Sequence, residues 1–150
     1  MSSGRTIAAA TAVSGALDIL FAMILTLLFG RNIGNMLRYV ASGPFPGATE
    51  WGAGGAVLGL AVHFALMGVM AAIFVAIVRH RPALLNAPLS TGLAYGLLTY
   101  AAMNLVVVQL RFHPGFPPKP LSIATQLFAH IVLVGIPMAL IARRTLRNAA

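Results

Sequence analysis

Six polar side chains interrupt stretches of the sequence that are otherwise apolar: Asp18, His63, Tyr100, Asn104, Gln126 and His130. A carboxyl group, two imidazoles and a phenol are groups that take up and release protons in proteins. Together, the six side chains could form a layer that handles protons or binds a ligand. Polar side chains in such stretches also hydrogen-bond helices to one another, and this structural role is the alternative at each position.

The same residues permit two other kinds of site. His63 and His130 could be the axial ligands of a haem b, because two histidines are the minimum that such a site requires. With Asp18 they also provide the ligand types of a two-histidine, one-carboxylate metal site. The sequence requires no cofactor, however, and a histidine in an apolar helix is more often a hydrogen-bonded core side chain than a ligand.

Motifs of hydrolytic enzymes are missing from the chain. It contains no G-x-S-x-G, H-E-x-x-H or paired-carboxylate arrangement and no cysteine. The common serine-hydrolase and zinc-protease motifs therefore do not occur, and disulfides, thiolate metal sites and cysteine nucleophiles are excluded. The sequence favours a protein that is not an enzyme and leaves the question open.

The segments that carry the six polar residues are almost free of charge. Of the 150 residues, ten are Lys or Arg and two are Asp or Glu, 8% in all, where soluble domains carry about 25%. Crossing a bilayer takes about 20 residues, and because lipid offers the backbone no hydrogen-bonding partner, a crossing segment must be helical. We therefore expect an all-α integral membrane protein, a four-helix bundle that forms a single domain over residues 1–150. Four runs are long enough, with Asp18 as their one charged residue: 7–29, 55–78, 89–110 and 121–142.

The first run could instead be a cleavable signal peptide, since Arg5 precedes it. The apolar region of a signal peptide is about 7 to 15 residues long, whereas this run has 23 residues, from 7 to 29. We expect it to be kept as a helix.

The loops indicate how the helices are joined. The link 79–88 is short and holds two prolines, which predicts that runs 55–78 and 89–110 are antiparallel neighbours. In the first long loop, apolar residues recur at the spacing of a helix face, which predicts a short helix lying in the membrane interface. Its apolar face would hold Ile33, Met36, Leu37 and Val40, and its polar face Arg31, Asn35 and Arg38.

Small residues share faces with the polar ones. Gly55 and Gly59 lie on the face of His63, and such stripes let helices approach closely, so we expect this face to point into the bundle. Counted from the helix ends at 1.5 Å per residue, Asp18, His63, Tyr100 and His130 lie roughly 12 to 17 Å below one membrane surface. We expect them at one level, with Asn104 and Gln126 slightly nearer that surface.

The two halves of the chain resemble each other. The pattern H-x-x-L-x-G-x-x-x-A begins at His63 and again at His130. Because the second and fourth helices run in the same direction, this predicts a parallel two-helix repeat with an axis along the membrane normal. His63 and His130 would then occupy equivalent positions.

The cations beside the helix ends predict the orientation. Six lie on the side of the termini and four on the opposite side, which favours both termini in the cytoplasm. Juxtamembrane arginines attract anionic lipid headgroups, and no basic stripe typical of nucleic-acid binding is present. We therefore expect the lipid bilayer, and no nucleic acid, as the partner of these cations. The six are Arg5, Arg79, Arg81, Arg143, Arg144 and Arg147.

A family resemblance lies in the last third of the chain. It rests on the stretch from Thr125 to Val132 and on the following Arg143, Arg144 and Arg147. A glycine-rich helix and a proline-rich loop precede this stretch. Over residues 55–147 the chain is similar to YagU-like bacterial inner-membrane proteins, and both His63 and His130 fall on their pattern. The resemblance implies a four-helix protein of the bacterial inner membrane. It implies no activity, and Asp18 has no clear counterpart in it.

Three functions are compatible with the sequence. The first is a non-enzymatic accessory or assembly component that contacts a second copy of itself or a larger membrane complex. The second is a transporter or a pathway for protons or a small solute, formed by the intramembrane Asp, His and Tyr side chains. The third is haem b binding through His63 and His130.

Overall fold

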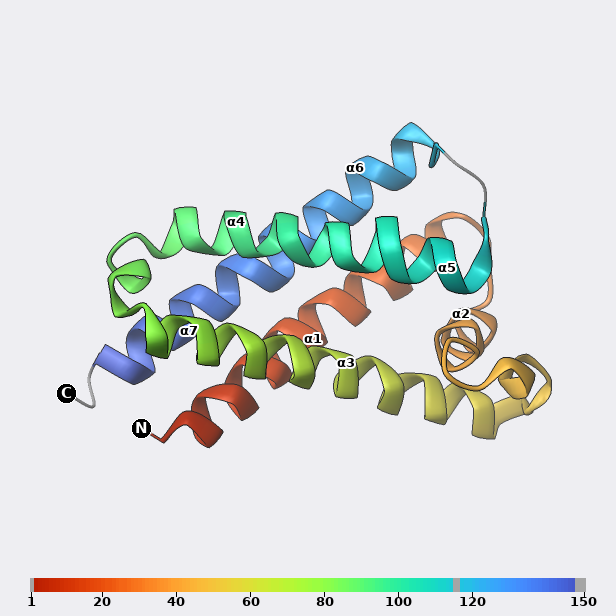
Figure 1. Cartoon of the computed structure of the whole chain (residues 1–150). Coiled ribbons are helices and arrows are strands. Elements are labelled where there is room, and N and C mark those ends of the chain that lie inside the picture. Colours follow the sequence, from red (N-terminus) through yellow and green to blue (C-terminus); the bar gives the residue numbers. More distant parts are fainter. Residues whose placement is uncertain (1, 115–116, 148–150) are drawn as a thin grey trace.

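A computed structural model describes residues 2–114 and 117–147 (Figure 1). These residues are helical and contain no strand. Four helices are long and apolar enough to cross a membrane, which confirms the four predicted spans: Ser3–Leu28, Gly52–His80, Pro88–Phe112 and Pro120–Leu146. Each is longer than the apolar run that predicted it, because the helical backbone continues into the flanking polar residues.

The first span is α1 and the second is α3, while the third and fourth spans each consist of two α-helices joined by a π-helical segment, η3 or η4. Three short helices, α2, η1 and η2, lie in the connections. The elements in chain order are α1 (Ser3–Leu28), α2 (Ile33–Ala41), η1 (Pro46–Glu50), α3 (Gly52–His80), η2 (Pro82–Asn86), α4 (Pro88–Tyr100), η3 (Ala101–Val107), α5 (Val108–Phe112), α6 (Pro120–Phe128), η4 (Ala129–Gly135) and α7 (Ile136–Arg147).

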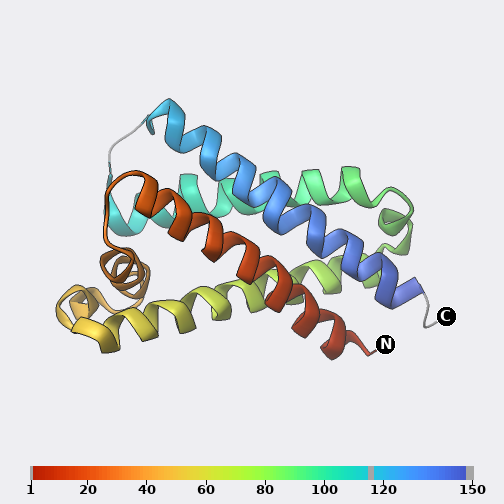
Figure 2. The ribbon, with the colours of Figure 1, turned by 180° about the vertical axis from the view of Figure 1, so that it is seen from behind.

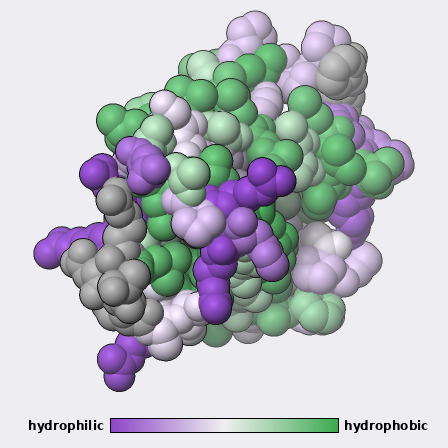
Figure 3. All heavy atoms as spheres, turned by 60° about the vertical axis from the view of Figure 1, so that its left-hand side comes forward, coloured by the Kyte–Doolittle hydropathy of each residue, from purple (hydrophilic) through white to green (hydrophobic). Residues whose placement is uncertain are grey.

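The spans form two layers that cross each other, α3 with the third span in one and α1 with the fourth span in the other (Figures 1 and 2). We call the end that carries both termini and η2 the terminal end, and the opposite end, where α2 lies, the α2 end. Exposed arginines gather at the terminal end, and hydrophilic side chains cluster there between apolar flanks (Figure 3).

α1 lies antiparallel to the fourth span, with contacts from Thr6 to Phe21. The Thr6 and Thr145 hydroxyls are 2.8 Å apart near the terminal end. The Ser14 hydroxyl donates to the carbonyl of Val134 at 3.4 Å, and nearer the α2 end the rings of Phe21 and Phe128 are 5.2 Å apart. The first and last spans are therefore direct neighbours.

The second and third spans run antiparallel, as their short link requires, but they are not each other's main packing partners. α3 packs on α1 and α2, whereas α4 packs on η4 and α7. The side chain of Tyr95 bridges the two spans: its hydroxyl donates to the carbonyl of Met70 at 2.6 Å, and its ring lies 4.8 Å from that of Phe74. The predicted neighbours are therefore joined through side chains.

The short helix predicted in the first loop is present as α2, with the Asn32 side chain accepting from the backbone N–H of Asn35 at 3.0 Å as its N-cap. It packs on the start of α3, where a Cβ at Gly59 would overlap the carbonyl of Leu37. The expectation that Gly55 and Gly59 face the centre of a bundle is wrong, because the structure seats α2 and η1 on this face.

Arg111, at the end of the third span, ties that span to α2. Its guanidinium donates to the carbonyls of Ser42 and Gly43, at 2.6 and 2.7 Å, just beyond the last turn of α2. The ring of Tyr39 stacks on that of Phe112 at 4.4 Å. Partial burial raises the pKa of the Tyr39 phenol above its ordinary value, and the nearby charge of Arg111 partly opposes this.

The seat of α2 can be tested with two glycines of α3. We expect Gly59→Ala to displace α2 and to lower the free energy of unfolding by about 1 to 3 kcal/mol, as overpacking does. Gly54→Ala is the matched control, because nothing lies within 4 Å of a Cβ there, and it should be neutral or slightly stabilising. Unfolding followed by circular dichroism in detergent gives both values, and equal effects of the two substitutions would contradict this packing.

The titration of Tyr39 gives a second readout of the same contact. A pKa raised in the folded state means that the packing of α2 contributes stability below the ordinary pKa of tyrosine, about 10, and loses it as pH rises through the folded value. The difference in tyrosinate absorbance between the wild type and Tyr39→Phe should therefore have a midpoint above 10. In Gly59→Ala this midpoint should fall toward 10, and an ordinary midpoint in the wild type would argue against a packed α2.

Candidate functional site

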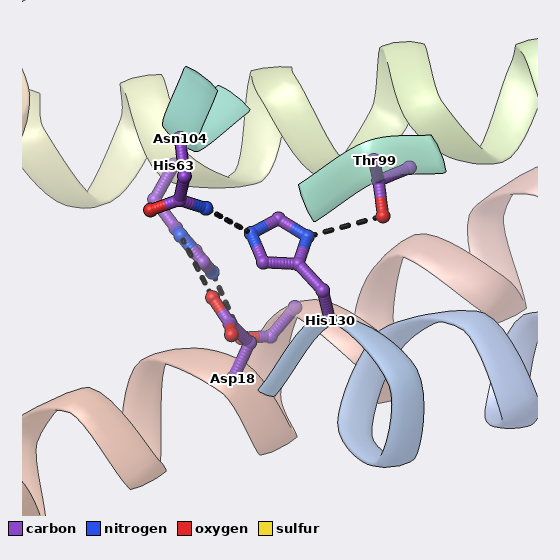
Figure 4. Close-up of polar contacts among 6 residues, drawn as sticks. Asp18, His63, Thr99, Asn104 and His130 are labelled. Atoms are coloured by element: carbon purple, nitrogen blue, oxygen red, sulfur yellow. Dashed lines mark hydrogen bonds and ion pairs between the residues drawn. The ribbon is translucent and has the colours of Figure 1, made fainter. Parts of the chain in front are cut away.

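Asp18, His63 and His130 lie at one level along the spans. Asp18 is on α1, and it lies between the two positions, Ser14 and Phe21, that contact Val134 and Phe128 of the fourth span. This antiparallel register puts Asp18 opposite His130, which lies in η4. His63 of α3 faces α1 at the same level (Figure 4).

Asp18 and His63 form a carboxyl and imidazole pair. The Nδ1 atom of His63 is 3.8 Å from Oδ2 of Asp18. The other ring nitrogen, Nε2, is 2.9 Å from the carbonyl oxygen of Gly15. A carbonyl can only accept a hydrogen bond, so Nε2 of His63 carries a proton. The ring nitrogen that remains available for proton exchange is therefore Nδ1, which faces Asp18.

This arrangement fixes how many protons the pair holds when it has no net charge. With Nε2 protonated, one further proton belongs either to Nδ1 of His63, beside a carboxylate, or to the carboxyl group of Asp18, beside a neutral imidazole. Both forms have zero net charge. Gain or loss of one proton gives the pair a charge of one unit, and the site is 9% exposed at the His63 side chain and 21% at Asp18.

His130 is held as a neutral imidazole by a chain of hydrogen bonds. The Thr99 hydroxyl donates to the carbonyl of Gly96 at 3.0 Å, so it accepts at 3.1 Å from Nδ1 of His130. Nε2 of His130 accepts from the side-chain amide of Asn104 at 3.3 Å. Both ring nitrogens have partners of the right kind with Nδ1 protonated and Nε2 unprotonated.

The two π-helical segments flank this second cluster. Asn104 lies in η3, His130 lies in η4, and Thr99 is two residues before η3 begins. The third and fourth spans touch here, since a Cβ at Gly96 would overlap backbone atoms of His130 and Ile131. A wide turn changes the direction in which the following side chains point, and π segments recur at functional sites.

Tyr100 and Gln126 are outside the hydrogen-bonded clusters. The ring of Tyr100 is edge-on to that of His130 at 6.1 Å. Within residues 2–114 and 117–147, no hydrogen bond reaches the Tyr100 hydroxyl or the half-buried side chain of Gln126. The six candidate residues do not include Thr99 or the carbonyl of Gly15, which are partners of His130 and His63 in the structure. Thr99 is detectable from the sequence, because it lies close to the level of Tyr100.

The geometry gives no support to a metal or haem site. In the part of the chain that the structure describes, no three His, Cys, Asp or Glu side chains are grouped so that they could hold a metal ion. The Nε2 atoms of both histidines already take part in hydrogen bonds.

Comparison with known proteins returned no match to a protein family, to a curated protein or to a solved structure. The resemblance to YagU-like proteins therefore stays a hypothesis. What the chain does must be argued from the geometry of the two clusters.

The protonation of His130 is directly measurable. We expect the ¹⁵N chemical shifts of its ring, in selectively labelled protein, to show a neutral imidazole with the proton on Nδ1 at pH 7. Asn104→Leu should change the shift of Nε2, because it removes the donor to that nitrogen, and it should leave the shifts of His63 in place. A doubly protonated His130 ring, or a proton on Nε2, would refute the chain of hydrogen bonds.

Proposed function

We propose that this chain is a small multi-pass membrane protein whose Asp18 and His63 side chains bind and release a proton within the membrane. One observation carries the proposal: Nε2 of His63 is committed to the carbonyl of Gly15, and Nδ1 faces the carboxyl group of Asp18 at 3.8 Å. Such a pair can accept a proton at one group and release it from the other with little movement. The function that follows is a pathway or transporter coupled to protons.

The low dielectric of the membrane makes the net charge of the pair important. Moving one proton on or off changes the charge from zero to one unit, and an uncompensated charge in the membrane is costly. The neutral form is therefore expected at rest, and a charged form would persist only while a counter-charge or solute is bound. We infer coupling between proton occupancy and a second event at this site.

Several finer features belong to the same proposal. We propose a four-helix bundle built from two parallel repeats, supported by each histidine bonding to the span before its own: His63 to α1 and His130 to α4. We place the chain in the bacterial inner membrane with both termini in the cytoplasm, supported by the six cations near the terminal end. Four helices are few for a pathway, so we also propose that the chain acts with a second copy.

A second candidate is a non-enzymatic accessory or assembly component of a membrane complex. It is favoured by the pairing of the fully buried polar atoms: within the described residues, every fully buried side-chain nitrogen and oxygen has a hydrogen-bonding partner. A layer that only fixes the register of the helices would have this property. Under this candidate the pair would keep one protonation state.

Proton flux distinguishes the two candidates. The purified protein is reconstituted into liposomes that contain a pH-sensitive dye, and a potassium gradient with valinomycin drives proton entry. We expect Asp18→Asn and His63→Gln to lower the flux at least tenfold, because each removes one member of the pair. Glu50→Gln, which neutralises the only other acidic residue of the chain, is the matched control and should keep wild-type flux.

Infrared difference spectroscopy tests the same proposal at equilibrium. A carboxyl band that changes with pH in the wild type and is lost in Asp18→Asn, but not in Glu50→Gln, would support proton exchange at the pair. If Asp18→Asn folds and conducts protons as well as the wild type, the proposed function is wrong. A wild-type protein without flux and with an invariant Asp18 band would favour the accessory role.

A further inference from the structure

The buried residues of the main apolar cluster lie on one side of the Asp18 and His63 pair, whereas Leu37, Ala41 and Ala48 are buried separately at the α2 end. On α1 the main cluster begins with Ala10, and on α3 it runs from Met67 to Val78. On the fourth span it runs from Val134 to Ala142. All of these residues of the main cluster lie between the pair and the terminal end, so a packed and dry layer separates the pair from that end.

The spans are packed differently on the other side of the pair. No residue of η3, α5 or α6 is buried. Polar side chains are half-buried there instead, at Asn104, Gln109 and Gln126, and the Gln109 amide lies 3.5 Å from the carbonyl of Asn104. Between the pair and the α2 end, the third and fourth spans therefore carry half-buried hydrogen-bonding groups, whereas on the terminal side they contribute to the apolar cluster.

Tyr95 closes the terminal side between α3 and the third span. Its hydroxyl bonds to the Met70 carbonyl and its ring packs on Phe74, so the two spans are joined about two helical turns from His63, on the terminal side. The next link between the same two spans is α2, which packs on Gly59 of α3 and is held by Arg111 of the third span. Gly59 is one helical turn from His63. α2 is therefore the element that lies next to the pair on this side.

We infer that the Asp18 and His63 pair exchanges protons with water at the α2 end only, and that the core seals it from the terminal end. This inference rests on the proposed function and adds a direction to it. The partner of the site is then a proton donor or acceptor from the aqueous phase at the α2 end, and delivery to the other side requires the core around Tyr95 to open. On this inference, the conformation described here exchanges protons at the α2 end.

Cysteine accessibility tests the direction, and the chain suits it because it contains no cysteine. Single cysteines are placed at Asp18 and Asn104, on the predicted route, and at Ser14, which is buried one turn toward the terminal end. Two reference variants, Glu50→Cys at the α2 end and Arg81→Cys at the terminal end, show which end each face of the proteoliposome presents. The probe is a charged, membrane-impermeant methanethiosulfonate, which reacts only where water reaches.

We expect Asp18→Cys and Asn104→Cys to react at least tenfold faster when the probe is added to the face that labels Glu50→Cys. Ser14→Cys, a nearly isosteric change, should react from neither face. Reaction of Asp18→Cys or Asn104→Cys from the face that labels Arg81→Cys, from both faces or from neither would overturn the inference. Asn104→Cys keeps the test decisive if Asp18→Cys does not fold.

The labelling experiment does not depend on proton binding. One-sided labelling together with absent proton flux would leave the direction of access standing and refute the proposed function. Flux that depends on Asp18, together with labelling from the terminal end, would keep the function and refute the direction. The two failures are therefore distinguishable.

Discussion

The scarcity of hydrogen-bonding partners in hydrocarbon is the constraint on which this structure depends. A polar side chain placed in a span must find its partner on another span or on its own backbone. Ser14 finds the carbonyl of Val134, His63 that of Gly15, and His130 the hydroxyl of Thr99. Each bond can form in one register only, so these few contacts determine how far each helix is shifted along its neighbour. Apolar side chains, which are interchangeable with lipid, could not do this.

Backbone proximity is what makes the most elaborate of these contacts possible. Gly92 and Gly96 of α4 lie directly against the backbone of the fourth span around Gly135. At that separation the ring of His130 reaches Thr99 behind it and Asn104 in front. The glycines let the two backbones approach closely, and η3 and η4 change the direction of the side chains. Together they allow both ring nitrogens of His130 to form hydrogen bonds. His63 also has two partners, the carbonyl of Gly15 and Asp18, but Asp18 can itself exchange a proton, whereas Thr99 and Asn104 cannot. This difference separates a locked histidine from an exchangeable one.

Some of these features can be predicted from the sequence and others cannot. The four spans follow from the positions of twelve charges, and α2 follows from the spacing of its apolar residues, because both signals are local. Depth within the membrane is also countable, which is why Asp18, His63 and His130 could be assigned to one level. The direction in which a side chain points around the helix axis cannot be predicted by counting residues across a π-helical segment. Tyr100 and Gln126 lie before η3 and η4, and they were grouped with Asn104 and His130, which lie within these segments and to which they do not hydrogen-bond. The partner of a glycine face is equally non-local: Gly59 could have met any span, and it meets α2.

The contact between the first and last spans has a consequence for biogenesis. α1 is translated before the other three spans, yet Thr6 and Ser14 obtain their partners from residues of the fourth span, more than a hundred positions later. Until then Asp18 can rely on His63 alone. The nascent protein must therefore hold α1 beside the insertion machinery, or in lipid beside α3, until the fourth span has been translated. The contacts of Thr6 and Ser14 can form only after the fourth span has been translated.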